Sequence, residues 1–231
     1  MDAARHLLVI MPHTGECFSC SGTVAKHTRA GDHATLVSVC SGAERLGEAW
    51  ERHVEGCRRG AAVLGAKFEA LSFASSGVLE VTRENKVAIA EVIRRLRPDV
   101  MITMPREEMY EQPHSDHEAT HLLVYHARDL AARRFELPSG LPSHFVNDLY
   151  FLGDGSPGDI FVDVTDVQEL VGRAWEAIAY GDLLSASHGA LPLGVSLKRP
   201  VVYQRRVGPD CAVEAFRACY YREKTLDLLP A

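Results

Sequence analysis

The sequence predicts an α/β fold with three layers, in which a mostly parallel sheet is covered by helices on both faces. Short runs rich in apolar and β-branched residues alternate with longer helical patterns, and no internal repeat interrupts this order. Two of the short runs, His6–Met11 and Val100–Met104, are apolar throughout most of their length, as strands buried on both faces are. Because 231 residues leave little room for a second core, we expect residues 1–231 to form a single domain.

The expected elements follow one another in strand–helix order. The expected strands are His6–Met11, Ala34–Cys40, Phe68–Phe73, Val100–Met104, Asn147–Leu152 and Ile160–Val164. The expected helices are a stretch that ends at Ala30, then Leu46–Leu64, Asn85–Leu96, His117–Arg134 and Gln168–Leu184. Gly65 is suited to the end of the second helix, Pro98 stops the third, and Thr165 or Asp166 can cap the start of the last. We expect residues 192–231 to belong to the same domain and to close over the site.

The composition argues against several classes of protein. Apolar residues make up 46% and charged residues 24% of the chain, and the formal net charge is −6, which is typical of a globular protein and not of a basic nucleic-acid-binding one. No apolar run approaches the roughly 18 residues that cross a bilayer. The N-terminus enters the first expected strand without a basic leader, so we expect a cytoplasmic protein that binds neither nucleic acid nor membrane.

The six cysteines do not form the pattern of a disulfide scaffold. Cys17 and Cys20 form a CxxC motif, which fits a redox pair or one half of a zinc site. Because no second CxxC follows, small buried thiols are the favoured interpretation of both residues.

Two polar clusters directly follow expected strands and carry the candidate chemistry. The first is Pro12–Glu16, and the second is His114–His117. Parallel strands present their carboxyl ends at one edge of a sheet, where open α/β folds bind their ligands. Imidazoles and carboxylates are ligands that zinc prefers, and three of them with one open position form a catalytic site.

Isolated histidines are weaker evidence, and we interpret these as surface or core residues: His27, His33, His53, His126, His144 and His188. For His121, packing is favoured over a supporting role at the site.

An ordered series of short motifs extends this argument over about residues 5–125. The series is Pro12-His13-Thr14-Gly15-Glu16, Cys20-Ser-Gly-Thr-Val-Ala-Lys26, Ser41-Gly-Ala-Glu44, Arg52-x-x-Glu55, Ala62-Val-Leu-Gly65, Arg97-Pro-Asp99 and His114-Ser-Asp-His117. In this order the motifs resemble those of the PIG-L/LmbE superfamily of zinc-dependent N-deacetylases. The resemblance implies a three-layer Rossmann-like fold, a Zn²⁺ cofactor and a small-molecule substrate.

Carried over position by position, the resemblance implies a role for each residue of the two clusters. His13 and His117 correspond to zinc ligands, and Glu16 most nearly takes the place of the third, an aspartate in the family. His114 corresponds to the histidine that stabilises an oxyanion or donates a proton. Asp116 corresponds to a residue that supports this loop.

Two departures from the family pattern bear on the reaction. Gly15 stands where the family has the aspartate that acts as general base, and a glycine cannot accept a proton. The segment from His13 to Thr23 is one residue shorter than usual, so Glu16 aligns either with the ligand aspartate or with the glutamate after it. Glu44, after the second expected strand, is the candidate replacement base. The alternative for Glu44 is an orienting partner for a loop or for Arg45, and the sequence leaves both open.

Three functions therefore compete. The leading one is a hydrolase of the N-deacylase type with a relocated base. The second is a hydratase of an unsaturated oxo-acid, because the 4-oxalomesaconate hydratase branch of the superfamily also lacks the first aspartate and has a segment similar to Ala43–Trp50. Against the second, the chain keeps the deacetylase-like Cys20–Thr23. The third is a catalytically degenerate binding protein. The sequence names no substrate, and a homo-oligomer is compatible with all three.

Overall fold

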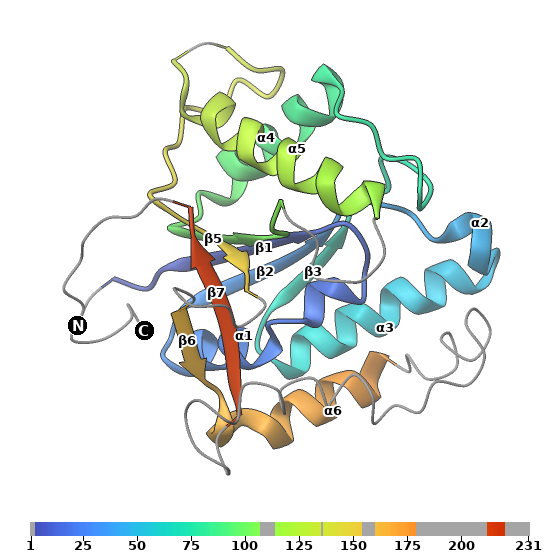
Figure 1. Cartoon of the computed structure of the whole chain (residues 1–231), viewed down its shortest axis with the longest axis vertical. Helices are drawn as coiled ribbons and strands as arrows, with labels where there is room; N and C mark the ends of the chain where they lie inside the picture. The colour runs from blue at the N-terminus through green and yellow to red at the C-terminus, as the bar shows by residue number, and fades with distance from the viewer. Residues whose placement is uncertain (1–2, 107–113, 135, 154–159, 179–211, 220–231) are drawn as a thin grey trace.

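A seven-stranded sheet with the order β3-β2-β1-β4-β5-β7-β6 forms the centre of the protein (Figure 1). The structure is a computed structural model that describes residues 3–106, 114–134, 136–153, 160–178 and 212–219. The strands are β1 (His6–Met11), β2 (His33–Ser38), β3 (Lys67–Ala70), β4 (Val100–Thr103), β5 (Asp148–Leu152), β6 (Ile160–Asp163) and β7 (Val213–Ala218). The first five pair in parallel, and β7 runs antiparallel to both β5 and β6. The predicted mostly parallel sheet is confirmed.

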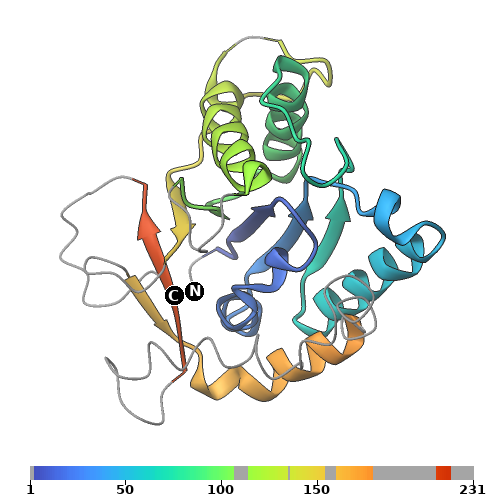
Figure 2. The ribbon, with the colours of Figure 1, turned by 45° about the vertical axis from the view of Figure 1, so that its right-hand side comes forward.

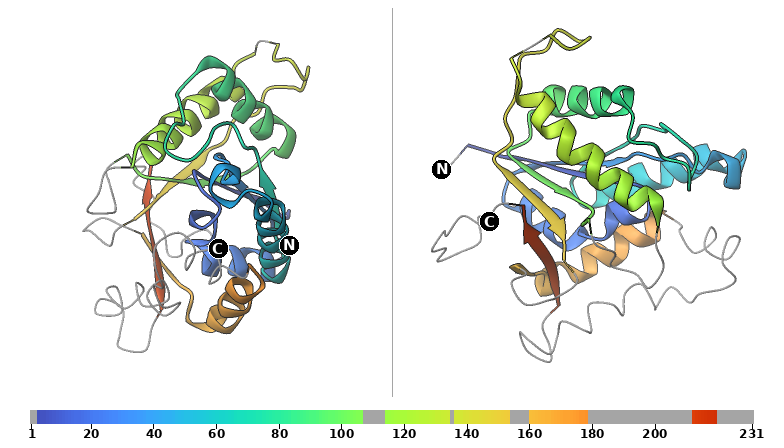
Figure 3. Two further views of the ribbon diagram at one scale, coloured as in Figure 1. Left: turned by 90° about the vertical axis from the view of Figure 1, so that its right-hand side faces the viewer. Right: turned by 45° about the horizontal axis from the view of Figure 1, so that its top comes forward.

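Helices cover both faces of the sheet, as predicted. They are α1 (Ser21–Arg29), α2 (Ala43–Leu46), α3 (Ala49–Val63), α4 (Arg83–Leu96), α5 (Ser115–Ala132) and α6 (Gln168–Ile178). Figures 2 and 3 show α4 and α5 together on one face, with α1, α3 and α6 on the other. The side chains of β1 alternate between the two cores: Leu7 and Val9 lie in the α1–α3–α6 core, whereas Leu8 and Ile10 lie in the α4–α5 core. Both faces of β1 are buried, which explains its continuous apolar run.

The second predicted helix begins later than expected because glycine interrupts it. Gly47 adopts φ +51° and ψ −128°, outside the helical region, so the short helix α2 ends before it and α3 starts at Ala49. Thr165 lies in a 3-10 turn (Thr165–Val167) that precedes α6, and its hydroxyl accepts a hydrogen bond from the backbone N–H of Ala212. The predicted end of this helix at Leu184 lies outside the described residues, as does most of 192–231.

Strand β7 was absent from the predicted elements, and its charged residues explain why. Glu214 and Arg217 interrupt the apolar pattern of Val213–Ala218. The Glu214 carboxylate accepts hydrogen bonds from the backbone N–H groups of Gly22 and Thr23, at 2.8 Å each, and so satisfies free donors in the first turn of α1. In the part of the chain that the structure describes, no helix has both the length and the apolarity needed to cross a membrane.

Candidate metal centre

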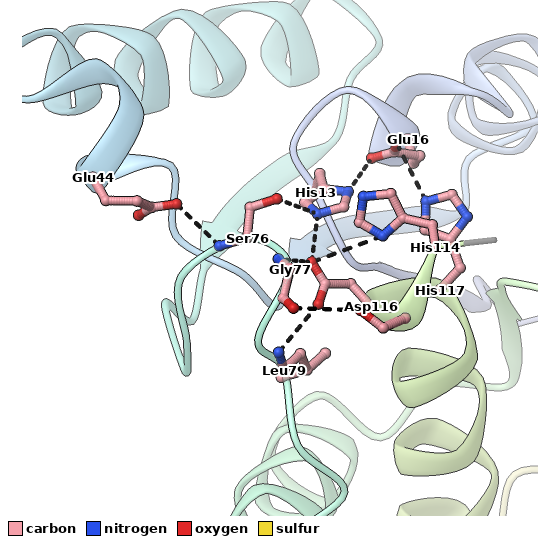
Figure 4. Close-up of polar contacts among 10 residues, drawn as sticks. His13, Glu16, Glu44, Ser76, Gly77, Leu79, His114, Asp116 and His117 are labelled. Atoms are coloured by element: carbon pink, nitrogen blue, oxygen red, sulfur yellow. Dashed lines mark hydrogen bonds and ion pairs between the residues drawn. The ribbon is translucent and has the colours of Figure 1, made fainter. Parts of the chain in front are cut away.

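The two polar clusters of the sequence meet at the carboxyl ends of β1 and β4, which are neighbouring strands (Figure 4). His13 follows β1, and Glu16 begins a 3-10 turn (Glu16–Phe18). His114 directly precedes α5, and His117 lies in its first turn. Residues about a hundred positions apart are thereby brought side by side, as the parallel topology predicts.

Glu16 lies against both of the predicted metal-binding histidines. Its Oε2 atom is 3.3 Å from Nδ1 of His13, and its Oε1 atom is 3.7 Å from Nε2 of His117. Burial alone would raise the pKa of the Glu16 carboxyl, but the contacts with His117 and His13 outweigh it and hold the pKa well below its usual range. Although the loop is one residue shorter than in the family, the Glu16 side chain is long enough for its carboxylate to contact both imidazoles.

Three imidazoles form a compact group at the same point. The rings of His114 and His117 are stacked, with centroids 4.6 Å apart and an interplanar angle of 15°, and His13 meets His114 edge-on at 4.8 Å. One ring nitrogen from each of the three histidines lies within 4.8 Å of the others. The three histidines therefore form one set of three donors, and Glu16 lies beside this set, where it reaches His13 and His117 through different oxygens.

The charges and unsatisfied atoms of this group fit a cation. The Oε2 atom of Glu16 and the Nδ1 atom of His114 are buried and make no hydrogen bond with the residues that the structure describes. Burial lowers the pKa of His13, but its contacts with the carboxylates of Asp116, at 2.9 Å, and of Glu16, at 3.3 Å, outweigh this and raise the pKa to about 9. In this structure a protonated His13 thus balances the two carboxylates, and a bound cation would supply that charge instead.

The opposite edge of His13 contacts the Asp116 carboxylate, which is fully buried. Nε2 of His13 is 2.9 Å from Oδ2 of Asp116, which also accepts a hydrogen bond from the N–H of Gly77, while Oδ1 accepts one from the N–H of Leu79. A carboxylate that holds the far nitrogen of a metal-ligating histidine fixes the orientation of its ring. The Asp116 carboxylate is therefore placed to orient His13 and to secure the loop after β3, whereas the predicted support of its own loop stays a prediction.

A second group, formed by His13, Cys40 and Asp116, also has donors within 4.8 Å of one another. Burial raises the pKa of the Cys40 thiol, and the charge of Asp116 raises it further, so the thiol keeps its proton. Asp116 already accepts hydrogen bonds from two backbone N–H groups. Cys40 and Asp116 are therefore better suited to supporting His13 than to binding a metal themselves.

Glu44 contacts the loop after β3. Its exposed carboxylate accepts a hydrogen bond from the N–H of Ser76 at 3.0 Å, and the Ser76 hydroxyl lies 3.1 Å from Nε2 of His13 (Figure 4). The contact corresponds to the orienting alternative, and the role of general base stays a prediction. Sequence reasoning missed Ser76, Gly77 and Leu79, because a short serine- and glycine-containing loop carries no sign of what it contacts.

Other candidate residues have structural surroundings. Cys17 and Cys20 are free, buried thiols, as the favoured interpretation expected. His121 is buried with its Nδ1 atom 3.0 Å from the carbonyl oxygen of Met104, and its ring packs on Phe151. His188 lies outside the described residues.

The chain has relatives among known enzymes. Residues 8–128, just over half of the chain, match the family described as PIG-L: GlcNAc-PI de-N-acetylase. Diacetylchitobiose deacetylase of Thermococcus kodakarensis is 31% identical over 183 residues, which cover 74% of this chain and 67% of that protein.

Solved structures share the fold. The 4-carboxy-2-hydroxymuconate hydratase GalB of Pseudomonas putida KT2440 has a TM-score of 0.75 at 21% identity, covering 97% of this chain and 100% of that one. The N,N'-diacetylchitobiose deacetylase of Pyrococcus horikoshii has a TM-score of 0.75 at 20% identity, covering 97% and 88%.

The family match and the Thermococcus kodakarensis relative define the class of the protein, which is an enzyme of the metal-dependent hydrolase type. The chain belongs to the PIG-L family.

Proposed function

We propose that the protein is a zinc-dependent hydrolase of the N-deacylase type, in which His13, Glu16 and His117 hold the metal. One observation carries the proposal. The Glu16 carboxylate lies between the two histidines, with Oε2 3.3 Å from Nδ1 of His13 and Oε1 3.7 Å from Nε2 of His117, so that a negative charge adjoins both imidazoles. Two histidines and one carboxylate form a ligand set found in hydrolytic zinc enzymes. The Thermococcus kodakarensis relative, named as a diacetylchitobiose deacetylase, supports an acylated amine as the substrate.

Glu16 is preferred to His114 as the third ligand because of charge and exposure. The Glu16 carboxylate carries a negative charge that compensates a divalent cation, whereas an imidazole ligand is neutral. The His114 side chain is 40% exposed, whereas that of His117 is only 10% exposed. His114 is therefore available to a substrate that enters from solvent.

In the proposed reaction, each residue of the site has a separate role. When bound, zinc would polarise a carbonyl oxygen and lower the pKa of a water molecule. His114 would stabilise the oxyanion or donate a proton through its exposed ring edge. Asp116 would hold His13 in place throughout. Gly15 leaves the position of the family's usual base empty, so another carboxylate must accept the proton, and Glu44 is our candidate.

The variant Glu44→Gln tests the base. A glutamine still accepts the hydrogen bond from the N–H of Ser76 but cannot take up a proton at neutral pH. If Glu44 is the base, turnover should fall by about 10²–10⁴ while zinc affinity stays unchanged. Normal turnover would instead limit Glu44 to orienting the loop.

A hydratase is the second candidate, and Gly15 is the observation that favours it, because adding water to a conjugated double bond does not require the deacetylase base at that position. The GalB structure shows that this fold accommodates such a reaction.

The experiment that separates these functions is a substrate panel on zinc-loaded protein, with the His117→Ala variant as the metal-free control. Release of acetate from N-acetylated amino sugars supports the hydrolase. Loss of the ultraviolet absorbance of a conjugated oxo-diacid supports the hydratase. Zinc binding without either reaction favours a degenerate binding protein.

A further inference from the structure

Nε2 of His13 has two neighbours, and the second, Ser76, belongs to none of the motifs of the sequence. Oδ2 of Asp116 lies 2.9 Å from this nitrogen, and Oγ of Ser76 lies 3.1 Å from it on the side of the loop after β3. Figure 4 shows Ser76 and Glu16 on opposite sides of the His13 ring. The Nε2–H group is thus placed to be shared between a carboxylate and a hydroxyl, while Nδ1 faces Glu16.

The loop that carries Ser76 is held by hydrogen bonds from several elements. The backbone N–H of Ser41 donates to the carbonyl oxygen of Ala74, and Ser41 forms an isolated parallel bridge with Ser75. The N–H of Ser76 donates to Glu44 of α2 at 3.0 Å. Further along, the N–H groups of Gly77 and Leu79 donate to Asp116, as described above. A loop that is tied at both ends and in its middle holds the Ser76 hydroxyl at a defined position.

We infer that Ser76 is a positioning residue for His13: it shares the Nε2–H with Asp116 and so keeps Nδ1 directed at the metal position. This inference rests on the proposed metal site. With a single hydrogen-bond acceptor at Nε2, the imidazole ring can still tilt while it keeps that hydrogen bond. A second acceptor in another direction restricts this tilt. Ser76 acts through His13 and contacts neither metal nor substrate.

The test compares Ser76→Thr with Ser76→Val, two substitutions of the same shape that differ in the hydroxyl. Zinc affinity is measured by competition with a chromophoric chelator, and the thermal midpoint of the metal-free protein is measured beside it. We expect the valine variant to bind zinc about tenfold more weakly, at the low end of the 10–100-fold range for such partners, because Asp116 remains. The threonine variant should bind nearly as well as the wild type, and both variants should unfold at the same temperature. Ser75→Val is the matched control in the same loop, because the Ser75 hydroxyl takes part in none of these contacts.

The outcomes separate this inference from the proposed function. If the wild type binds zinc and the threonine and valine variants bind it equally well, the positioning role of Ser76 is overturned while the metal site stands. If the wild type binds no zinc, both are overturned. If Ser75→Val weakens binding as much as Ser76→Val, the effect belongs to the loop as a whole, and the role of the hydroxyl is rejected. Loss of affinity confined to Ser76→Val establishes the role even if no hydrolysis is found.

Discussion

The two edges of the His13 ring have very different surroundings. At Nδ1, Oε2 of Glu16 lies 3.3 Å away and makes no hydrogen bond with the described residues, and the neighbouring His114 is partly exposed. At Nε2, the buried Asp116 carboxylate accepts hydrogen bonds from two backbone N–H groups as well as contacting the ring. An edge with unmet polar groups can accept a ligand, whereas an edge with satisfied groups can only hold the ring in place. The difference supports our proposal that the Nδ1 side of His13 takes part in the chemistry and that the Nε2 side holds the ring in place.

Removing a histidine from the open edge should have the largest effect. We expect His117→Ala or His13→Ala to reduce the zinc content of the purified protein from about one per chain to near none, because each change leaves only two strong donors. Metal analysis by mass spectrometry after dialysis measures this. Full zinc occupancy in both variants would overturn the assignment of the open edge as the metal site.

The second prediction concerns Glu16. Glu16→Gln replaces a charged donor with a neutral one of the same size, so we expect it to weaken zinc binding by more than the roughly 10–100-fold that supporting residues cause. Glu16→Asp keeps the charge but loses one methylene of reach and should bind with intermediate affinity. If instead Glu16→Gln binds zinc normally while His114→Ala does not, the three histidines are the ligand set.

Asp116→Asn tests the supporting edge and should have a smaller effect. The amide retains one acceptor oxygen, but its NH₂ group must face the N–H of Gly77, the N–H of Leu79 or the Nε2–H of His13, each of which is a donor in the zinc-bound state. We expect zinc affinity to fall by about 10–100-fold without loss of the bound-metal stoichiometry at high zinc. Isothermal titration of metal-free protein measures this. A loss as complete as that in His117→Ala would place Asp116 among the ligands.

The sequence predicted the open edge better than the supporting one, and the reason is physical. Metal chemistry limits the residue types that can act as ligands, so the two polar clusters were recognisable as candidates, and the resemblance to the PIG-L/LmbE superfamily implied His13 and His117 as the ligands within them. Ser76, Gly77 and Leu79 support Asp116 and His13 largely through backbone N–H groups and one hydroxyl, which nearly any loop could offer. Strand β7 was missed for a related reason, since Glu214 has a function at the start of α1 that replaces the apolar pattern with a charge.

The smallest predicted effect lies one step further from the metal, at Glu44. Its carboxylate is exposed and reaches His13 only through Ser76, so Glu44→Ala removes one exposed hydrogen bond from the loop. Such a bond contributes about 0.5–1 kcal/mol, which corresponds to a loss of zinc affinity of about two- to fivefold. Glu44→Gln keeps the acceptor oxygen and should bind zinc as tightly as the wild type, so the pair isolates the hydrogen bond from the charge. Equal losses in the two variants would show that the negative charge of Glu44, and not its contact with Ser76, contributes to zinc affinity. If Glu44→Ala lost as much zinc affinity as Asp116→Asn, Glu44 of α2 would contribute to holding His13 as strongly as Asp116 does. The exposure of Glu44 argues against this outcome.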